Sequence, residues 1–531
     1  MPKVFPLFGW MLLMGGLSAL CQAINLGWVR PQASQIDYVW WDQGAMLYCA
    51  SHLLAGDLLY RDFYFNYGPV PLVGFSLVAK LFGISPFSFE LHKILIDALA
   101  VMAACWLFLK HLPRWAALTG LLLTQFCFLT GGTFLPGSYE KLGLILIVLT
   151  WNPPGGRSAR NAFWVGLLLG ALQGVKFGSC FVAGLVVLLL DVSAWIMAGG
   201  LRQQWWGWLR NLGIIFAGYA LFQTFWVSLA FSLMPSGYAW DAVFPKYMLD
   251  WYASYVGPAH RWPGFCNWNY FISYQLVLVA GVLFGIGYLV RSLLGRLSAS
   301  TNVQWAMGSP EITSLRFIFF PIFYLIGCLI YFKHSSNIMV YGWLTVMAMP
   351  FWLVVARGVW RIGLILMLIP CACVLPVHLS RNLLRPMPAN LVRHVMPNGG
   401  ALYLTKEEAA EFDGLISRLK QIDQETPQKR GFVVIPLGYG VGFWGQIPLA
   451  SRHHWFYPAV VQPYESEQVW QEFAHAKAIV LILAGPGDFF GYPRGLLENG
   501  TWLPFDTTRQ RELLNRFGKP IWFEGRFVIY N

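Results

Sequence analysis

Carboxylates, an arginine and several tyrosines gather close to the N-terminal end of the chain. One group is Trp41-Asp42-Gln43-Gly44, and another runs from Tyr60 to Pro69 with the sequence YRDFYFNYGP. A carboxylate can take the proton of an acceptor hydroxyl as that oxygen attacks a sugar, and a cation can hold a leaving phosphate. The residue types therefore make Asp42 and Asp62 candidate general bases and Arg61 a candidate phosphate ligand.

A purely structural role fits the same residues. Asp42 stands at the expected start of a helix, where a carboxylate often caps backbone N–H groups. Asp62 can pair with Arg61 or cap a turn. From the spacing alone, the catalytic and the structural role of each carboxylate both stay open.

The composition indicates which elements must hold these residues. Hydrophobic residues make up 57% of the chain and charged residues 12%, with a mean hydropathy of +0.52. A soluble globular protein has about 25% charged residues, so most of this surface cannot face water. The net charge of +12 fits basic loops on the cytoplasmic side of a membrane rather than a nucleic-acid partner. We expect a polytopic α-helical membrane protein.

Apolar runs of about 20 residues, enough to cross a membrane, recur along the sequence. We expect about eleven transmembrane helices, at 6–27, 86–109, 114–134, 138–154, 161–177, 179–198, 208–232, 269–290, 313–332, 337–356 and 360–379. Lysines and arginines gather in alternate separators, which places the N-terminus inside. The odd number of spans then places the C-terminus outside.

Two outer loops follow from this topology, at 29–85 and 233–268. The first contains two apolar segments, 42–56 and 68–83. Each is too short to cross a membrane, and the apolar residues of the first recur at helical spacing. We expect both to be helices that lie in the membrane interface.

The last part of the chain has a different character. Charged residues return near Arg381, and helix-like stretches alternate with the strand-like runs 432–436, 478–483 and 527–530. This alternation predicts a small α/β domain. We therefore expect a transmembrane domain at 1–379 and an extracytoplasmic α/β domain at 380–531.

The first outer loop resembles that of bacterial GT-C glycosyltransferases, the protein O-mannosyltransferase-like and aminoarabinose-transferase-like enzymes that use polyprenyl-phosphate sugars. The matching residues are Asp42-Gln43-Gly44, Tyr60-Arg61-Asp62-Phe63, Tyr67-Gly68-Pro69, Lys80-Leu81-Phe82-Gly83 and the glycine-rich run from Gly170 to Lys176. The family has an Asp-Glu pair where this chain has Asp42-Gln43, so a role that needs two adjacent acids is in doubt. The resemblance implies a GT-C-like fold in a bacterial inner membrane, with an extracytoplasmic active site.

The same resemblance implies roles for individual residues. Asp42 matches the proposed general base, and Glu140 matches a second acidic residue that faces the same cavity. Lys176 and Lys333 would face the donor phosphate. The remaining candidates, which would line the substrate loops, are Tyr67, Lys246, His260, Arg261 and His334.

Several of these residues have an alternative interpretation. Glu140 can be a charge at the membrane edge beside Lys141, and Lys176 can be a lysine that reaches the lipid headgroups. The basic and aromatic residues of 233–268 fit an interfacial belt as well as a lid over a sugar phosphate.

The run Gly440-Val441-Gly442-Phe443-Trp444-Gly445 has the letters of a dinucleotide-binding fingerprint. We reject that function because Pro448 interrupts the helix that should follow, because the sequence lacks the βαβ context, and because the domain is predicted to lie outside the cell. A glycine-rich turn at the rim of the active site is the better interpretation.

Three classes of function fit the sequence. The first is a glycosyltransferase that moves one sugar from a polyprenyl-phosphate-linked donor to a lipid, glycan or protein acceptor at the outer membrane face. The second is a transporter or flippase of lipid-linked glycans, which tends to show repeats and polar residues at the bilayer midplane; here no repeat is visible, and only Asp97 and Asp191 lie deep. The third is a catalytically degenerate membrane scaffold. We expect the first, with no cofactor or metal site predicted and a dependence on a divalent metal left open.

Overall fold

The chain divides into two units in the computed structural model. Unit 1 comprises Met1–Trp28, Lys93–Trp226 and Tyr255–Leu384, and unit 2 comprises Val29–His92, Val227–Ser254 and Arg385–Asn531. The structure describes residues 4–28, 31–65, 67–130, 135–152, 158–197, 205–244, 320–327, 343–355, 358, 361–366, 369, 379–380, 382–429, 431–435, 438–453, 466–482, 508–509, 512, 515, 520–524 and 526–530.

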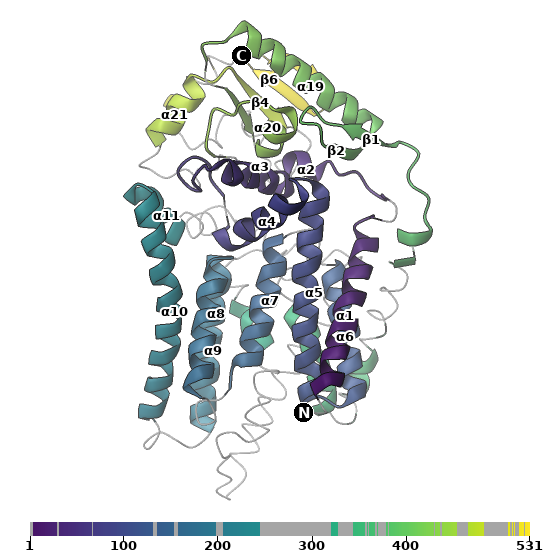
Figure 1. The fold of residues 1–531 in the computed structure, drawn as a ribbon, viewed down its shortest axis with the longest axis vertical. Helices are drawn as coiled ribbons and strands as arrows, with labels where there is room; N and C mark the ends of the chain where they lie inside the picture. The colour runs from purple at the N-terminus through teal and green to yellow at the C-terminus, as the bar shows by residue number, and fades with distance from the viewer. Residues whose placement is uncertain are drawn as a thin grey trace, which may run out of the picture. The chain divides into compact units, whose positions relative to one another are not determined.

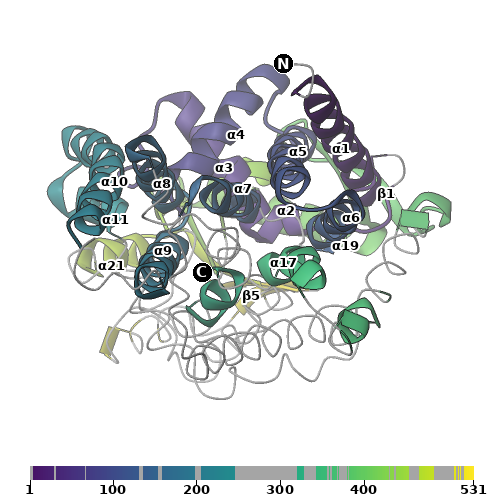
Figure 2. The same cartoon turned by 90° about the horizontal axis from the view of Figure 1, so that it is seen from below.

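Apolar helices make up the described part of unit 1. They are α1 (Val4–Asn25), α6 (Arg114–Thr130), α7 (Leu135–Thr150), α8 (Ala159–Gln173), α9 (Phe177–Met197), α17 (Trp343–Val355) and most of α5 (Pro86–His111) and α10 (Trp205–Leu233). Figure 1 shows α1, α6, α7, α8 and α9 with similar directions, and the view in Figure 2 shows α17 beside α6, which it contacts.

Four helices in the described part of the chain are long and apolar enough to cross a membrane. They contain the stretches Leu7–Asn25, Pro86–His111, Phe177–Ala194 and Trp205–Leu233. The chain is therefore a helical membrane protein, as the composition predicts. Of the eleven expected spans, 269–290 lies outside the described residues. The spans that are described only in part are 114–134, 138–154, 179–198, 313–332, 337–356 and 360–379.

Glycines allow α8 and α10 to approach each other closely. A Cβ atom on Gly166 would lie less than 3.0 Å from the backbone of Ile215, and one on Gly218 would meet the carbonyl oxygen of Phe163 in the same way. Gly170, one turn beyond Gly166, leaves room for the Phe222 side chain. Small residues four apart are the usual means by which membrane helices pack backbone to backbone, and this explains the glycine-rich run in the fifth predicted span.

Unit 2 contains the first outer segment and the C-terminal part of the chain. Its helices are α2 (Asp37–Trp40), α3 (Asp42–Ala55), α4 (Pro69–Phe82), α11 (Ser236–Val243), α19 (Lys406–Glu425), α20 (Tyr439–Gly445) and α21 (Ser466–Ala474). Its strands are β1 (Leu391–Val395), β2 (Ala401–Thr405), β3 (Phe432–Ile435), β4 (Ala478–Ile482), β5 (Pro520–Glu524) and β6 (Phe527–Tyr530).

The strands form two sheets. β1 and β2 are an antiparallel pair, and the second sheet has the order β3-β4-β6-β5. Within it β3 and β4 are parallel, whereas β6 is antiparallel to both β4 and β5. The strand-like runs in the sequence thus become β3, β4 and β6. All the described residues of β3 and β4 are buried, so both strands lie in the core of unit 2.

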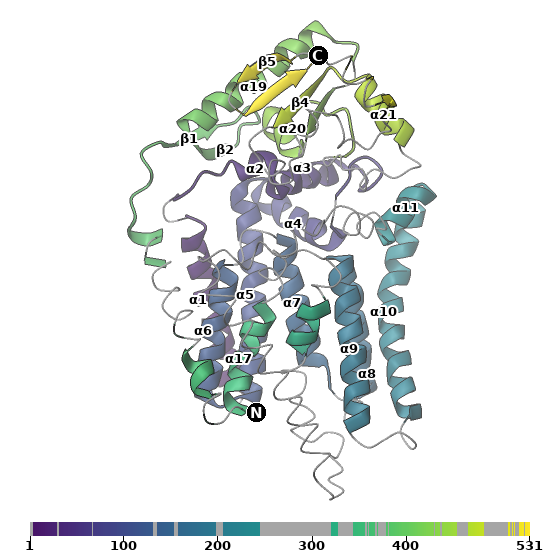
Figure 3. The same cartoon turned by 180° about the vertical axis from the view of Figure 1, so that it is seen from behind.

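Helix α19 packs against β1, β2 and β5 with one apolar face. Thr405 caps its N-terminus, and Glu408 bonds back to the Thr405 N–H, which completes a capping box. Phe412, Leu415 and Leu419 are buried at helical spacing, which is the pattern of an amphipathic helix. Figure 3 shows α19 lying across the sheet near β5, which it contacts.

The two short apolar segments of the first loop form helices, but only one of them keeps an exposed apolar face. In α3 the apolar positions Met46, Cys49 and Ala50 are buried, because α3 packs against α2, α4 and α20. The expectation that α3 lies in the membrane interface is therefore not supported by its burial. Helix α4 does carry an exposed apolar stripe, which includes Leu77 and Leu81.

Candidate functional site

Asp42 lies in the first turn of α3 and accepts a hydrogen bond from Tyr67. The Tyr67 hydroxyl donates to Asp42 Oδ2 at 3.0 Å, which joins the two groups of the first-loop motif. The N-cap residue is Trp41, and its side chain makes no capping hydrogen bond. Asp42 is thus one residue inside the helix, where its charge faces the positive end of the helix dipole. The alternative role of Asp42 as the N-cap is wrong.

Arg61 and Asp62 bind each other in the following turn. Arg61 Nε and Nη2 donate to the two oxygens of Asp62 at 2.9 and 2.7 Å, and the Leu58 N–H donates to Oδ2 at 2.8 Å. The hydrogen bonds from Arg61 lower the pKa of Asp62 below its ordinary value. The carboxylate therefore forms an ion pair and caps a turn, which are the contacts of the structural alternative.

Glu140 is a buried carboxylate in unit 1. It lies in α7 and is 2% exposed, so it does not sit at the membrane edge as an exposed charge. Its Oε1 accepts hydrogen bonds of 2.6 Å from the hydroxyls of Ser179 and Tyr324. These two donors come from α9 and from the described segment 320–327. Nothing in the sequence pattern links either residue to Glu140, and sequence reasoning missed both.

Lys176 lies at the junction of α8 and α9, three residues before Ser179. Its N–H donates to the Leu172 carbonyl at 2.8 Å, and its side chain is largely buried at 9% exposure. A lysine that reached the lipid headgroups would be exposed. The burial of Lys176 therefore favours a position inside the protein over one at the headgroups. Lys176 thus lies in the same part of unit 1 as Ser179, which donates a hydrogen bond to Glu140.

The other predicted site residues lie outside the described residues. They are Lys246, His260, Arg261, Lys333 and His334. Asp42, Tyr67, Arg61 and Asp62 belong to unit 2, whereas Glu140 and Lys176 belong to unit 1. The candidate residues thus form two groups, one in each unit, and each group is described by itself.

The GxGxxG run forms helix α20, and its glycines pack against protein. A Cβ atom on Gly44 would lie 2.9 Å from the Cα of Gly440, and one on Gly440 would strike the backbone of Val39. The space that a pyrophosphate would need is filled by α2 and α3. The expected absence of a βαβ context is wrong, since β3 is parallel to β4 and α20 lies between them in the chain. The close packing of Gly440 against α2 and α3 is the observation that argues against a nucleotide site.

Both deep acidic residues have partners. Asp97 Oδ2 accepts a 2.6 Å hydrogen bond from Lys93 Nζ, which also donates to Gln22 of α1 at 3.1 Å. Asp191 accepts a 2.7 Å hydrogen bond from the indole N–H of Trp151. These contacts join neighbouring helices of unit 1 and give both carboxylates a structural role.

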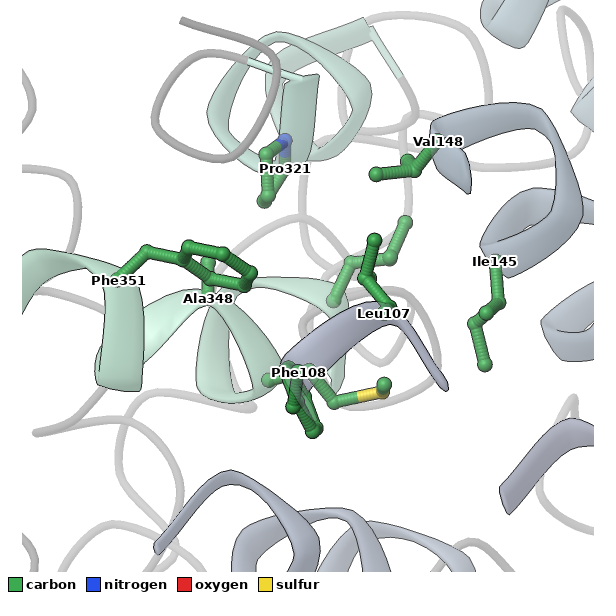
Figure 4. A pocket seen from close by; sticks show the side chains of 9 residues that line it. Leu107, Phe108, Ile145, Val148, Pro321, Ala348 and Phe351 are labelled. Atoms are coloured by element: carbon green, nitrogen blue, oxygen red, sulfur yellow. The ribbon is translucent and has the colours of Figure 1, made fainter. Parts of the chain in front are cut away.

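An apolar cavity lies in unit 1 (Figure 4). It is lined by Leu107, Phe108, Ile145, Val148, Pro321, Leu344, Met347, Ala348 and Phe351. None of these side chains carries a charge or a hydroxyl, so they offer no group to hold a phosphate or accept a proton. Among the described residues no group of three or more His, Cys, Asp or Glu side chains is placed to hold a metal ion.

Comparison with known proteins gives one kind of match. No protein-family model and no curated protein sequence matches the chain. Two solved structures are similar to it: ArnT from Cupriavidus metallidurans bound to undecaprenyl phosphate, at 12% identity and a TM-score of 0.48, and the same protein in the apo state, at 12% identity and a TM-score of 0.47. Each match covers 98% of this chain and 98% of the other.

Proposed function

We propose that this chain is a membrane glycosyltransferase that transfers one sugar from a polyprenyl-phosphate-linked donor to a hydroxyl or amine acceptor. The transfer takes place at the outer face of the bacterial inner membrane. Asp42 is the general base, and Tyr67 fixes the orientation of its carboxylate. The observation that carries the proposal is the 3.0 Å hydrogen bond between Tyr67 and Asp42, because it links the two groups of the first-loop motif.

The chemistry is a single displacement at the anomeric carbon. The acceptor oxygen or nitrogen forms a bond to C1 of the sugar as the bond from C1 to the phosphate oxygen breaks. Asp42 takes the acceptor proton, and the electron pair of the broken bond leaves with the polyprenyl phosphate. Attack opposite to the leaving group inverts the anomeric centre. General-base catalysis of this kind typically contributes 10²–10⁴-fold in rate.

Lys176 is the described cation that we assign to the leaving phosphate. It is buried in unit 1, and a cation in a site with little water stabilises developing negative charge more strongly than one in bulk water. Arg61 is engaged by Asp62, so it serves the phosphate only if that ion pair opens. Glu140, held by Ser179 and Tyr324, has the fixed orientation of a residue that positions other groups.

The partners of the two carboxylates that lie deep in the predicted spans, Asp97 and Asp191, support this proposal over a flippase. A transport pathway would place ionisable groups where a moving substrate can reach them. Asp97 is fully buried and paired with Lys93, and Asp191 is bonded to Trp151. Asp97 is thus held by Lys93 of the same helix, and Asp191 is held by Trp151 at the end of α7. A degenerate scaffold would need neither an oriented Asp42 nor a buried Lys176.

A direct assay tests the proposal. Purified protein in lipid nanodiscs is incubated with undecaprenyl-phosphate-linked mannose, glucose or 4-amino-arabinose, each labelled in the sugar, and with a membrane extract of the source bacterium as acceptor. We expect label to move to an acceptor, and undecaprenyl phosphate to be released, with at least one donor. Movement of an intact donor across the bilayer of a sealed vesicle, without release of undecaprenyl phosphate, would instead indicate the flippase.

A further inference from the structure

The C-terminal part of unit 2 contacts both of the segments that are joined by the Asp42–Tyr67 hydrogen bond. One segment is α3, which begins with Asp42, and the other runs from Tyr60 to Tyr67. We propose that Tyr439, at the start of α20, is a positioning residue for this pair and couples the C-terminal domain to the proposed catalysis. This inference rests on the proposed function and deepens it.

The first contact is between α20 and the helices of the first loop. The Tyr439 ring stacks on the Tyr48 ring of α3, with centroids 4.1 Å apart and an interplanar angle of 26°. The next residue, Gly440, lies so close to Gly44 that a Cβ atom on Gly44 would be 2.9 Å from its Cα. The indole N–H of Trp444 donates to the Tyr38 carbonyl at 2.7 Å. Helix α20 thus fixes α3 close to its first turn.

The second contact is made by the Tyr439 hydroxyl. Its oxygen accepts a hydrogen bond of 2.9 Å from the Tyr64 N–H, and the hydroxyl donates to the Arg452 carbonyl. The Arg452 carbonyl also accepts from the Tyr64 N–H at 2.8 Å. Tyr439 is 1% exposed, and burial raises the pKa of its hydroxyl well above the ordinary value, so the group keeps the proton that it donates.

The segment that this hydroxyl holds leads directly to Tyr67. Tyr60 has a positive φ of 68°, a conformation that few residues other than glycine adopt without strain. The guanidinium of Arg452 donates to the Tyr60 carbonyl. The Tyr60 hydroxyl in turn donates to the Tyr67 carbonyl at 3.0 Å. A chain of contacts therefore runs from Tyr439 through Tyr64 and Tyr60 to Tyr67.

One buried side chain thus touches both segments that carry the proposed catalytic pair, without touching Asp42 or Tyr67 in any contact given above. Its ring contacts the helix that carries Asp42, and its hydroxyl contacts the segment that carries Tyr67. A displacement of about 1 Å at a reacting group can cost 10²-fold in rate even when the mutation is remote. The sequence pattern gives no role to Tyr439, because Tyr48 and Tyr64 are more than 370 positions away in the chain.

Tyr439→Phe is the sharpest test, because it keeps the ring that stacks on Tyr48 and removes only the hydroxyl. We expect kcat for sugar transfer to fall about tenfold, which corresponds to the loss of about one hydrogen bond, with little change in KM for the lipid-linked donor. Tyr530→Phe, which also removes a tyrosine hydroxyl from the C-terminal domain but lies in β6, is the matched control and should retain normal turnover. Unchanged kcat in Tyr439→Phe would overturn the proposal.

A double-mutant cycle shows whether Tyr439 acts through the catalytic pair. In a Tyr67→Phe background the connection to Asp42 is already broken, so adding Tyr439→Phe should change kcat less than about twofold. An equal fall in both backgrounds would mean that Tyr439 acts independently of Tyr67. The kcat of each variant is corrected for its folded fraction, which is measured by thermal unfolding in nanodiscs.

Hydrogen exchange separates a failure of this inference from a failure of the proposed function. Amide exchange in the peptide that covers residues 58–68 should become faster in Tyr439→Phe than in wild type or Tyr530→Phe, whatever reaction the protein catalyses. Unchanged exchange would overturn the positioning role. A normal rate in Asp42→Asn would overturn the general base instead.

Gly440→Ala gives an independent perturbation of the same contact. The added methyl would meet the backbone of Val39. In Gly442→Ala it would press on the flexible side chain of Leu449 and reach the Ile447 carbonyl only at an ordinary van der Waals distance. We expect Gly440→Ala to lower kcat more than Gly442→Ala does. Should Gly440→Ala fail to fold, the Tyr439→Phe measurements decide alone.

Discussion

At the scale of single residues, Asp42 and Asp62 differ in the groups that donate hydrogen bonds to their carboxylates. Asp42 accepts a hydrogen bond from the neutral hydroxyl of Tyr67, whereas Asp62 is held by the guanidinium of Arg61 and the N–H of Leu58. A general base needs a carboxylate that can take up a proton, and an arginine opposes this by favouring the charged form. The ion pair with Arg61 therefore argues against Asp62 as the base.

The Arg61–Asp62 pair predicts a specific dependence of stability on pH. The folded-state pKa of Asp62 is lowered below 3.8, so its contribution to stability is present above the pKa of the unfolded chain and is lost as the pH falls through the folded value. Because the pair is exposed, the contribution is small. Unfolding curves of wild type and Asp62→Asn should differ slightly at about pH 6, and the difference should shrink as the pH falls below 3.8. A difference that grew towards pH 3 would contradict this sign.

The sequence predicts the residue types of the site better than their partners. The spacing in the first outer loop singles out Asp42 and Tyr67, and the structure joins them. The hydroxyls that hold Glu140 come from Ser179 and Tyr324, which are 39 and 184 positions away. Such contacts depend on how distant helices pack, and a local pattern contains no information about that packing.

At the scale of elements, the ion pair in α5 predicts a large effect on stability. Lys93 and Asp97 are 3% and 0% exposed, and removing one partner would leave an uncompensated buried charge. We expect Asp97→Leu to lower the free energy of unfolding by about 3–5 kcal/mol. The double variant Lys93→Met/Asp97→Leu, which removes both charges, should recover most of that loss. Thermal unfolding in nanodiscs measures both, and a double variant less stable than Asp97→Leu would contradict the prediction.

Helix α4 is predicted to contact lipid through its exposed stripe. Leu77 and Leu81 are 63% and 78% exposed, whereas Ala79 on the opposite face is 2% exposed. At 14 residues α4 is too short to cross a bilayer, so we expect it to lie in the interface. Spin labels at positions 77 and 81, on a cysteine-free background, should collide more with oxygen dissolved in the lipid than with a water-soluble nickel complex. The reverse preference would place the stripe in water or against protein.

Local patterns predicted the existence of the elements and missed some of their surroundings. Both short apolar segments of the first loop are helices, α3 and α4, as their periodicity indicates. Apolar periodicity does not distinguish a lipid surface from a protein surface, and the apolar positions of α3 pack against α2, α4 and α20. The glycines at positions 44 and 440 match only once both helices are in place.

At the scale of the whole molecule, the charge distribution predicts the orientation in the membrane. The excess of lysine and arginine in alternate loops places the N-terminus inside and the C-terminus outside. Alkaline phosphatase fused at Asn531 should therefore be active, and fusions at Arg202 or Arg291 inactive. Activity at either arginine, or none at Asn531, would contradict the orientation and with it an extracytoplasmic site.

The measurement that tests the general-base role most directly is sugar transfer by Asp42→Asn. Asparagine keeps the size of the side chain and can still bind Tyr67, but it cannot take up the acceptor proton. We predict that kcat falls by about 10²–10⁴-fold in protein that folds normally. Asp57→Asn, which removes a carboxylate of the same outer segment that binds His52, is the matched control and should keep normal turnover. Transfer by Asp42→Asn at a rate close to wild type would contradict the assignment of Asp42 as the general base.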